Sequence, residues 1–436
     1  MIENEAIFFK KIDIFQKIKY NIVMERFSTI IIGGGAAGLF LAANVTTEYG
    51  KVLLLERGER VGKKLSSTGN GQGNVTNALV GERPYLSVRG DKTQEKQIHG
   101  YLMRYGREEM LAFLESLGGL FLPDERGRYY PAGRQASAVT DLLRFAVAQR
   151  GVLVQTGSYV QKLKKEGGRY AVTAETPSGM QTYYADNVVV CTGGKAAKNF
   201  GTDGNGYTLA GGFGHSVTAL YPALVQLKTD TQYTKPLKGI RVMDSGLTAM
   251  VDGKLVCSLV GDVIFTDYGV SGDAVFRISS FIADKIDGRK VVLSLDLLPT
   301  VSKEKLVALL AEKRKKFPEL ADSELLCGIL NNQVGRAVMK RYGGGGFETV
   351  ADGVKCFTIP VVGSLGFDYA QVTKGGIPLA EVDEGLQSRY GDGLYFAGEI
   401  LDVDGECGGF NLQWAYTSAM VCAHSIEAKY RGQVWK

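Results

Sequence analysis

Two halves of one nucleotide-binding pattern lie about 360 residues apart in this chain. An apolar run at residues 28–32 leads directly into Gly33-Gly34-Gly35-Ala36-Ala37-Gly38. Glycines spaced as Gly-x-Gly-x-x-Gly permit a tight strand-to-helix turn and leave room for a pyrophosphate against the helix. Residues 393–399 then read as a strand followed by a glycine and an acid. We therefore expect a dinucleotide-binding domain interrupted by inserted sequence, a layout that favours FAD over NAD.

The context of the first glycines strengthens this prediction. Residues 39–45 continue as a small and apolar helix, whose first amides can meet the negative charge of a pyrophosphate. Residues 51–56 form a β-type run that ends in Glu56, at the spacing expected of the acid that binds ribose hydroxyls. Strand, glycines, helix, strand and acid thus occur in order, which an ordinary glycine-rich loop does not require.

Composition narrows the class of protein. The chain has 436 residues, of which 45% are apolar, so it can bury a large core and form two or three domains. Its net charge of +5 permits an anionic ligand but does not indicate a nucleic-acid partner. The six cysteines form no Cys-x-x-Cys pair and have no histidine at ligand spacing, so we expect no metal site. Without a signal segment or membrane span, we expect a cytoplasmic protein.

We expect an α/β fold with four parts. Residues 1–23 form an extension, for which Met24 as the natural start and a loosely attached amphipathic helix are both open interpretations. Residues 24–219 form the first segment of a Rossmann-like FAD-binding domain, and residues 366–436 form its second segment. Residues 220–365 form an inserted module, mostly β and barrel-like with a helical appendage, because short alternating segments and turn signals replace the earlier pattern. Such a module supplies a second wall for a cleft.

Periodicity places the main elements. Apolar residues recur at helical spacing over 97–117 and 136–149, and again over 302–316, 323–341 and 411–429. Short β-type runs at 151–154, 159–160 and 170–172 predict a small antiparallel layer, and a buried strand follows at 186–191.

Three glycine-rich segments are expected to face the nucleotide. Residues 61–77 are too rich in Gly, Ser and Asn for a helix, and Arg57, Lys63 or Lys64 lies near enough in sequence to meet phosphate. Thr192 and Gly193 form a turn that can bring the backbone close to the nucleotide. The turn at residues 408–412 opens a helix whose positive end suits the negative charge of a reduced flavin.

These residues resemble a known family, the YhiN/BaiN-like flavoproteins, which include enzymes called aminoacetone oxidases. The resemblance covers nearly everything from Arg26 to the last helix. It rests on residues 33–38, 62–64, 68–71, 74–77, 204–207, 214–215, 221–225 and 393–414. It implies non-covalent FAD in a two-segment Rossmann-like domain with a barrel-like and helical insertion. It also implies that Gly33, Gly35 and Gly38 face the pyrophosphate and that Glu56 binds the adenosine ribose.

The resemblance extends to the rest of the cofactor. It implies that Gly69, Asn70 and Asn74 lie along FAD, that the backbone near Val160 meets the adenine, and that Glu399 or Asp402 contacts the ribityl chain or pyrophosphate. Residues 409–412 would lie at the isoalloxazine ring. With the residue-based candidates, the expected cofactor-binding set is Gly33, Gly35, Ala36, Ala37, Gly38, Glu56, Arg57, Lys64, Gly69, Asn70, Asn74, Val160, Thr192, Gly193, Gly398, Glu399, Asp402, Gly409, Phe410, Asn411 and Leu412.

One departure from the family pattern affects the second glycine loop. Many members carry an Arg or Lys followed by Cys where this chain has Gln72 and Gly73. Losing a fixed cation and a thiol beside the flavin would alter flavin electrostatics or substrate choice. FAD binding should survive, because the backbone-based parts of the site remain.

The catalytic residues cannot be assigned from the sequence. Cys407, Tyr416, Lys374 and Thr373 are candidates near the expected ring, although Cys407 also fits a small residue in a tight turn. His215 is interpreted as a packing or capping histidine. No second nucleotide fingerprint is present, so either NADH or NADPH enters the cleft transiently or oxygen reoxidises the flavin.

Three functions are therefore considered. The first is a FAD-dependent oxidoreductase that transfers a hydride between flavin and a small or medium organic substrate, by amine oxidation or enone-type reduction. The second is a flavin-dependent tRNA-modifying enzyme, which the lack of a basic and aromatic surface pattern disfavours. The third is a non-catalytic flavin-binding regulatory protein. The sequence leaves the oligomeric state open.

Overall fold

A seven-stranded sheet forms the centre of the nucleotide-binding body. The computed structural model describes residues 26–83, 85–88 and 92–433, so the expected extension at 1–23 lies outside the described residues. The strand order is β6-β2-β1-β9-β8-β7, and β18 pairs with β9. The strands span β1 Arg26–Ile32, β2 Val52–Leu55, β6 Leu153–Gln155, β7 Tyr159–Glu166, β8 Arg169–Thr176, β9 Gly179–Val190 and β18 Leu394–Phe396. The late strand β18 joins the sheet in parallel with β9, so sequence from both sides of the insertion builds one sheet.

The apolar character of β1 explains its central place. Ile30, Ile31 and Ile32 are all buried, as expected of a parallel strand that is covered on both faces. Burial of each such side chain stabilises the fold by about 1.5–3 kcal/mol. On one face lie the helices α2 (Ala36–Asn44), α5 (Ala136–Gln149) and α12 (Phe410–Tyr430), with α2 packed between the other two. Among the described residues no helix combines the length and apolarity needed to cross a bilayer.

Two local predictions for the first segment are wrong. The helix expected over 97–117 is two helices, α3 (Lys92–Arg104) and α4 (Arg107–Ser116). The chain breaks at Gly106, whose amide donates to Glu109 Oε2 at 2.9 Å in a capping box. The run at 151–154 does not join the antiparallel layer, because β6 pairs in parallel with β2 after the α5 crossover. The antiparallel layer is made by β7, β8 and the first part of β9.

A small sheet lies beside the nucleotide-binding body. It has the order β3-β5-β4, with β3 at Thr76–Asn77, β4 at Phe121–Pro123 and β5 at Arg128–Pro131. β3 contacts α12, so this sheet brings residues 121–131 to the start of the last helix.

The insertion contains a closed six-stranded barrel with its own core. Its strands pair in the order β11-β14-β13-β12-β15-β16, and β16 closes onto β11. They span β11 Leu227–Thr229, β12 Arg241–Val251, β13 Lys254–Phe265, β14 Gly269–Ser271, β15 Val291–Asp296 and β16 Phe357–Ser364. In β15 the alternate residues Val291, Leu293 and Leu295 are buried, because every second side chain of a barrel strand points inward.

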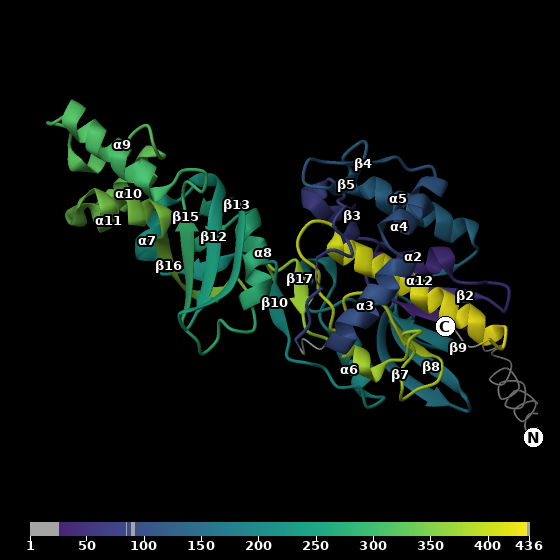
Figure 1. Ribbon diagram of the computed structural model, residues 1–436. Coiled ribbons are helices and arrows are strands. Elements are labelled where there is room, and N and C mark those ends of the chain that lie inside the picture. The colour runs from purple at the N-terminus through teal and green to yellow at the C-terminus, as the bar shows by residue number, and fades with distance from the viewer. Residues whose placement is uncertain (1–25, 84, 89–91, 434–436) are drawn as a thin grey trace, which may run out of the picture.

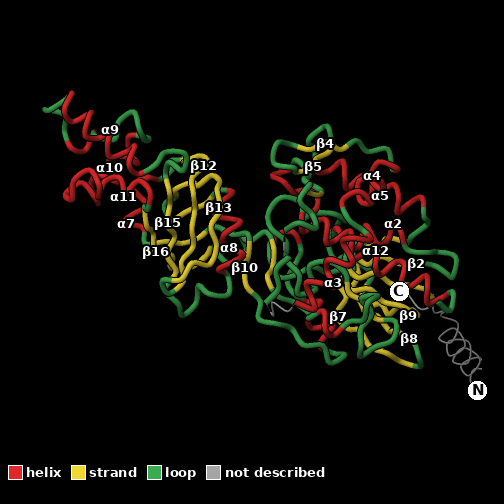
Figure 2. Tube along the Cα trace, in the orientation of Figure 1, coloured by secondary structure: helices red, strands yellow, loops and turns green. Residues whose placement is uncertain are grey.

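Helices flank this barrel at both ends. α9 (Lys303–Lys316), α10 (Asn332–Tyr342) and α11 (Gly346–Lys355) lie at the end away from the nucleotide-binding body, and α8 (Asp273–Ile282) lies on the near side (Figure 2). The helix expected over 323–341 begins only at Asn332, where Asn331 accepts from Gln333 N at 3.0 Å as an N-cap. Two short helices, α6 (Asn205–Gly211) and α7 (Thr231–Thr234), complete the α-helices of the described residues.

The two bodies are joined by a narrow connection. β10 (Tyr221–Ala223) leads out of the nucleotide-binding body, β17 (Val372–Lys374) leads back, and the two strands pair antiparallel with each other. Figure 1 shows this pair between the barrel and the larger body.

Candidate cofactor and substrate site

A cavity of about 1020 Å³ runs through the nucleotide-binding body to the face of the barrel and α8. Its walls include the glycines that follow β1, the loop at residues 62–74, the turn after β9 and the start of α12. Arg241, Asp262 and Phe276 contribute the wall on the inserted module. The cavity therefore combines a nucleotide-binding cradle with an opening between two bodies.

Two helices direct uncapped N-termini into this cavity. Within the described part of the chain, no side chain caps α2 at Gly35 or α12 at Gly409. Gly35, Ala36 and Ala37 line the cavity at the first helix, and Gly409 and Asn411 line it at the second. The first amides of a helix have no intrahelical acceptor and carry partial positive charge. Each end is thus suited to a negative group, a pyrophosphate at α2 and the electron-rich edge of a reduced flavin at α12.

The three fingerprint glycines have different roles. A Cβ built on Gly35 meets no protein atom within 4 Å, and the backbone there, at φ −76°, would accept any residue. Neither the protein nor the backbone angle therefore requires a glycine at this position. That empty space is where a pyrophosphate would lie. Gly33 has φ +104° and a Cβ there would lie 2.7 Å from Cys191 O, while a Cβ on Gly38 would lie 1.9 Å from Gly33 O. Gly33 and Gly38 therefore permit the turn and the close approach of α2.

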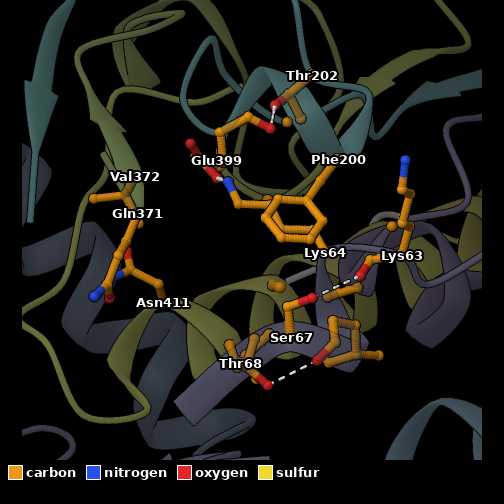
Figure 3. Close-up of a pocket in the computed structure, with 18 of the residues that line it drawn as sticks. Lys63, Lys64, Ser67, Thr68, Phe200, Thr202, Gln371, Val372, Glu399 and Asn411 are labelled. Atoms are coloured by element: carbon orange, nitrogen blue, oxygen red, sulfur yellow. Dashed lines mark hydrogen bonds and ion pairs between the residues drawn. The ribbon is translucent and has the colours of Figure 1, made fainter. Parts of the chain in front are cut away.

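Acidic and basic side chains fix the loops around the cradle. Glu56 accepts from Gly34 N at 2.7 Å and from Gly58 N at 2.6 Å, and so holds its carboxylate beside the glycine turn. Arg57 pairs with Asp203 at 2.5 Å and lies over the Tyr159 ring. Lys64 Nζ reaches Glu399 Oε2 at 2.9 Å, and Figure 3 shows these two side chains meeting near Phe200. The first and second segments of the nucleotide-binding body are thereby linked at the cavity.

The expected cofactor-binding residues divide into two groups. Eighteen line the cavity: Gly33, Gly35, Ala36, Ala37, Glu56, Arg57, Lys64, Gly69, Asn70, Asn74, Val160, Thr192, Gly193, Gly398, Glu399, Gly409, Asn411 and Leu412. Gly38, Asp402 and Phe410 do not. Asp402 is buried and accepts from Val88 N at 3.0 Å, and Phe410 packs edge-on against Tyr85. Asp402 therefore ties the loop before α12 to the backbone at Val88, and Phe410 packs the start of α12 against Tyr85.

The candidates for catalysis lie in different surroundings. Cys407 lines the cavity, and burial raises the pKa of its thiol to about 11, so it is not a thiolate at neutral pH. Tyr416 packs between Phe40 and Phe113, away from the cavity. The buried ammonium of Lys374 donates to Ser280 O at 3.0 Å, and Thr373 Oγ1 accepts from Lys195 N and Ala196 N. Tyr416, Lys374 and Thr373 therefore have structural roles.

His215 is a packed residue, as the sequence suggested. Its Nδ1 lies 3.0 Å from Glu381 Oε2 and its Nε2 lies 2.6 Å from Ser388 Oγ. Rings of Tyr390 and Phe396 pack against it. Burial lowers the pKa of His215, which therefore stays neutral at pH 7.

Sequence reasoning missed the residues at the substrate end of the cavity. Arg126, Arg128, Tyr130 and Arg134 line it from around β5. A Cβ built on Gly408 would lie 3.5 Å from Arg128 Cδ, and one built on Gly69 would lie 3.4 Å from Tyr130 Cε1. Arg128 and Tyr130 therefore lie beside the two loops that are expected to face the flavin. The closely spaced arginines and tyrosines of residues 126–134 are the sequence feature that could have indicated this part of the site.

The unusual Gln72 has a basic neighbour. Arg134 Nη1 lies 3.5 Å from Gln72 Oε1, so a cation from another segment lies beside this glutamine.

A Rossmann-like sheet completed by a late strand, with one cavity served by two helix N-termini, defines a FAD-dependent oxidoreductase. The chain belongs to the HI0933-like family, since the sequence profile of the HI0933-like protein Rossmann domain matches residues 27–425. This match confirms the family resemblance and the fold class expected from the sequence.

Curated relatives align over almost their whole length. The chain is 33% identical over 410 residues to 3-dehydro-bile acid delta(4,6)-reductase of Clostridium scindens, covering 91% of this chain and 98% of that protein. It is 27% identical over 423 residues to the ribosomal RNA dihydrouridine synthase of Haemophilus influenzae, covering 92% and 99%. A protein of the same name from Escherichia coli is also 27% identical, covering 93% and 99%.

Solved structures share the fold at low sequence identity. The 3-ketosteroid delta1-dehydrogenase of Sterolibacterium denitrificans superposes with a TM-score of 0.52 at 13% identity, covering 93% of this chain and all of that one. The 3-ketosteroid-delta4-(5alpha)-dehydrogenase of Rhodococcus jostii gives a TM-score of 0.51 at 16% identity, covering 93% and 98%.

Proposed function

We propose that this protein reduces a carbon–carbon double bond conjugated with a carbonyl group. The relative from Clostridium scindens is named for reduction of unsaturated 3-dehydro-bile acids, and the two ribosomal RNA enzymes are named for converting uridine to dihydrouridine. A delta(4,6)-reductase of a 3-oxo compound and a synthase of dihydrouridine would both saturate a carbon–carbon double bond conjugated with a carbonyl group. This shared chemistry favours enone-type reduction over amine oxidation for the present chain.

The observation that carries the proposal is the cavity with its two uncapped helix ends and its extension to the barrel. Bound FAD supplies the hydride in its reduced form. The residues at α2 and the loop at 62–74 would hold the dinucleotide, and Gly408 and Gly409 would face the ring. Asn411 fixes that turn, because its side chain bonds both the amide and the carbonyl of Gly405, at 2.9 and 2.8 Å.

Reduction of the double bond also requires a proton. The hydride goes to the carbon distant from the carbonyl, and the adjacent carbon must then receive a proton. We assign this proton to Tyr130 Oη, because Tyr130 lines the cavity and its ring lies beside the loop at Gly69. Burial raises the pKa of Tyr130, so the phenol carries its proton until the substrate carbanion takes it. The guanidinium groups of Arg128 and Arg134 lie 5.8 and 4.1 Å from its ring centroid and would stabilise the tyrosinate left behind.

The barrel wall orients the substrate and excludes water. Arg126 pairs with Asp273 at 3.4 Å, and Arg277 pairs with Glu406, also at 3.4 Å, so two ion pairs cross between the bodies beside the cavity. A substrate held between α12 and α8 would be shielded from solvent, which limits competing reactions of the reduced cofactor.

A reductant must reload the cofactor after each turnover. We propose that NADH or NADPH binds transiently in the same opening. Because the nicotinamide and the substrate would occupy the same part of the cavity, the nicotinamide must leave before the substrate enters.

The test uses the FAD-loaded protein without oxygen. Protein reduced with dithionite, free of excess reductant, is mixed with a 3-oxo-4-ene steroid, and the return of oxidised-flavin absorbance is followed together with the saturated product. We expect one product per flavin reoxidised. Reduction of the oxidised flavin by aminoacetone, with no reoxidation by the enone, would instead support amine oxidation. NADH and NADPH are compared as reductants in a separate experiment.

Reduction of uridine in RNA is a second candidate, because two relatives of 27% identity bear that name. The reduced protein is mixed with a uridine-containing RNA under the same conditions. Formation of dihydrouridine, with no reduction of the steroid, would favour this candidate.

A further inference from the structure

The loop that opens α12 contains two successive glycines with left-handed backbone angles. Gly408 has φ +113° and Gly409 has φ +101°, and both line the cavity. A Cβ built on Gly409 would lie 2.5 Å from Thr76 O, so β3 packs directly against this turn and leaves no room for a side chain. The peptide group between the two glycines immediately precedes the helix, and its orientation decides whether a C=O or an N–H faces the cavity.

Asn77 of β3 fixes the orientation of this peptide group. Its Nδ2 donates to Gly408 O at 2.9 Å. Asn77 is buried and does not itself line the cavity. Within a trans peptide group the C=O and the N–H point in opposite directions, and the described residues contain no cis peptide bond. Because Asn77 holds the carbonyl on its own side of the loop, the Gly409 N–H points the other way, toward the cavity.

A second anchor from the same strand holds the helix itself. Thr76 Oγ1 donates to Gln413 Oε1 at 2.6 Å, and both side chains are fully buried. Gln413 Nε2 in turn donates to Tyr105 O at 3.1 Å. Gln413 lies in the first turn of α12, so these bonds keep the N-terminus of the helix from withdrawing from the cavity.

The N–H at this end of the helix remains available to a ligand. The hydrogen bonds of the described residues include no acceptor for the Gly409 N–H, and no side chain caps α12. The N-terminus of a helix also carries partial positive charge. The turn therefore presents an oriented donor to the part of the cavity where the flavin ring is expected.

We propose that Asn77 is a positioning residue that sets the reduction potential of the bound flavin. Reduction places negative charge on the N1 and C2-carbonyl edge of the ring, which residues 409–412 are expected to meet. An N–H aimed at that edge stabilises the reduced form more than the neutral oxidised form. Without the bond from Asn77 the peptide group can rotate, and its carbonyl oxygen would then repel the same charge. This inference rests on the proposed placement of FAD and concerns the cofactor before any substrate binds.

The test measures the potential of the bound flavin without substrate. FAD-loaded protein is reduced stepwise without oxygen beside a reference dye, and the ratio of reduced to oxidised flavin is compared with that of the dye. Asn77→Ser is the informative variant. Its hydroxyl can still accept from Leu79 N, as Asn77 Oδ1 does at 3.0 Å, but it ends one bond earlier and cannot reach Gly408 O.

The expected effect is a shift toward oxidised flavin. At a fixed solution potential the ratio of reduced to oxidised flavin should fall about tenfold in Asn77→Ser, which is about 30 mV for a two-electron couple. The affinity for oxidised FAD should change by less than about threefold, because the oxidised ring carries no charge at that edge.

Further variants separate the orientation of the peptide group from the stability of the fold. Asn187→Ser removes another buried asparagine donor, whose Nδ2 bonds Ser28 O at 3.2 Å away from the cavity. It should lower thermal stability and leave the potential unchanged. Asn77→Ala loses both bonds of Asn77 and should shift the potential as far as Asn77→Ser does. If Asn77→Ser does not fold, Asn77→Asp keeps the bond to Leu79 N and should lower the ratio by about tenfold or more, because a carboxylate replaces the donor.

The outcomes distinguish this inference from the proposed function. A wild-type potential in Asn77→Ser, with reduced thermal stability, would leave Asn77 a purely structural role and overturn the inference. An equal shift in Asn187→Ser would also overturn it. So would a shift in Asn77→Ala that Asn77→Ser does not share, because the bond to Leu79 would then be responsible. A shifted potential in a protein that reduces no enone would remove enone reduction while the role of Asn77 stands.

Discussion

Lys64 and Glu399 are 335 positions apart in the sequence, yet their side chains form an ion pair of 2.9 Å at the wall of the cofactor cavity. The other oxygen of Glu399 accepts from Thr373 N at 2.9 Å. Glu399 therefore joins the loop after β2, the returning strand β17 and the turn after β18. Its carboxylate makes closure of the nucleotide site depend on three separate segments.

Loss of Glu399 should cost more than loss of Lys64. Lys64→Met should lower the free energy of unfolding by no more than about 1 kcal/mol, because the ion pair is partly exposed. Glu399→Ala should cost about 1–3 kcal/mol, because it also leaves the Thr373 amide without its acceptor. Urea denaturation of both variants, with FAD present and absent, measures the difference. Equal costs would mean that the ion pair alone carries the link.

Replacement of Gly35 should remove the cofactor and spare the fold. A valine there has an allowed backbone angle and meets no protein atom at Cβ, but it fills the space of the pyrophosphate. Gly35→Val should therefore purify colourless, with circular dichroism and a melting transition like those of apo wild type. Gly100→Val is the control, since Gly100 is exposed on α3 and its Cβ would also meet nothing.

Replacement of Gly38 should have the opposite effect and disrupt the fold. Its Cβ would lie 1.9 Å from Gly33 O, so Gly38→Ala should prevent folding of the β1–α2 turn and lower the yield of soluble protein. A well-folded Gly38→Ala protein, or a fully loaded Gly35→Val protein, would contradict these roles.

Removal of the Tyr130 hydroxyl should slow the reaction without weakening substrate binding. Loss of a positioned proton donor costs about 10²- to 10⁴-fold in rate. We expect Tyr130→Phe to show that loss in enone reduction by reduced protein, with unchanged FAD content and substrate Kd. Tyr129→Phe is the matched control, because the neighbouring Tyr129 faces Arg107 and lies outside the cavity. A full rate in Tyr130→Phe would assign the proton to another group.

His215 should make the fold sensitive to mild acid. Burial lowers its pKa below the ordinary value of 6.5, so between these two values the unfolded chain binds a proton that the folded protein does not. The free energy of unfolding should fall as pH drops below about 6.5. Denaturation curves between about pH 7.5 and 5 should show this slope in wild type, and a smaller slope in His215→Asn. An identical slope in both proteins would exclude His215 as the source.

The sequence allowed prediction of those elements whose residues act locally. The fingerprint at 33–38, the acid at Glu56 and the turn that opens α12 each combine backbone geometry and chemistry within a few residues. The class of fold follows from them, because strand, glycine turn and helix determine how a parallel sheet starts. The alternation of β15 likewise reveals a barrel strand from its own side chains.

Features that depend on distant partners could not be predicted in this way. Arg126 pairs with Asp273, which lies 147 residues later, and Arg134 approaches Gln72, which lies 62 residues earlier. The periodicity also predicted one continuous helix over 97–117. The structure breaks it at Gly106, where a Cβ would lie 2.5 Å from Leu102 O and a capping box starts α4. The same periodicity could not tell whether β6 pairs in parallel or antiparallel, because that depends on which edge α5 returns to.

The late arrival of β18 and α12 has a consequence for synthesis of the protein on the ribosome. The barrel strands, at residues 227–364, have their own core and emerge before residues 394–430, so that body can fold while the nucleotide-binding sheet still lacks a strand. The proposed FAD-binding site is incomplete until α12 has emerged from the ribosomal exit tunnel. Messages cut short before that point should yield polypeptides that hold a folded barrel but never turn yellow.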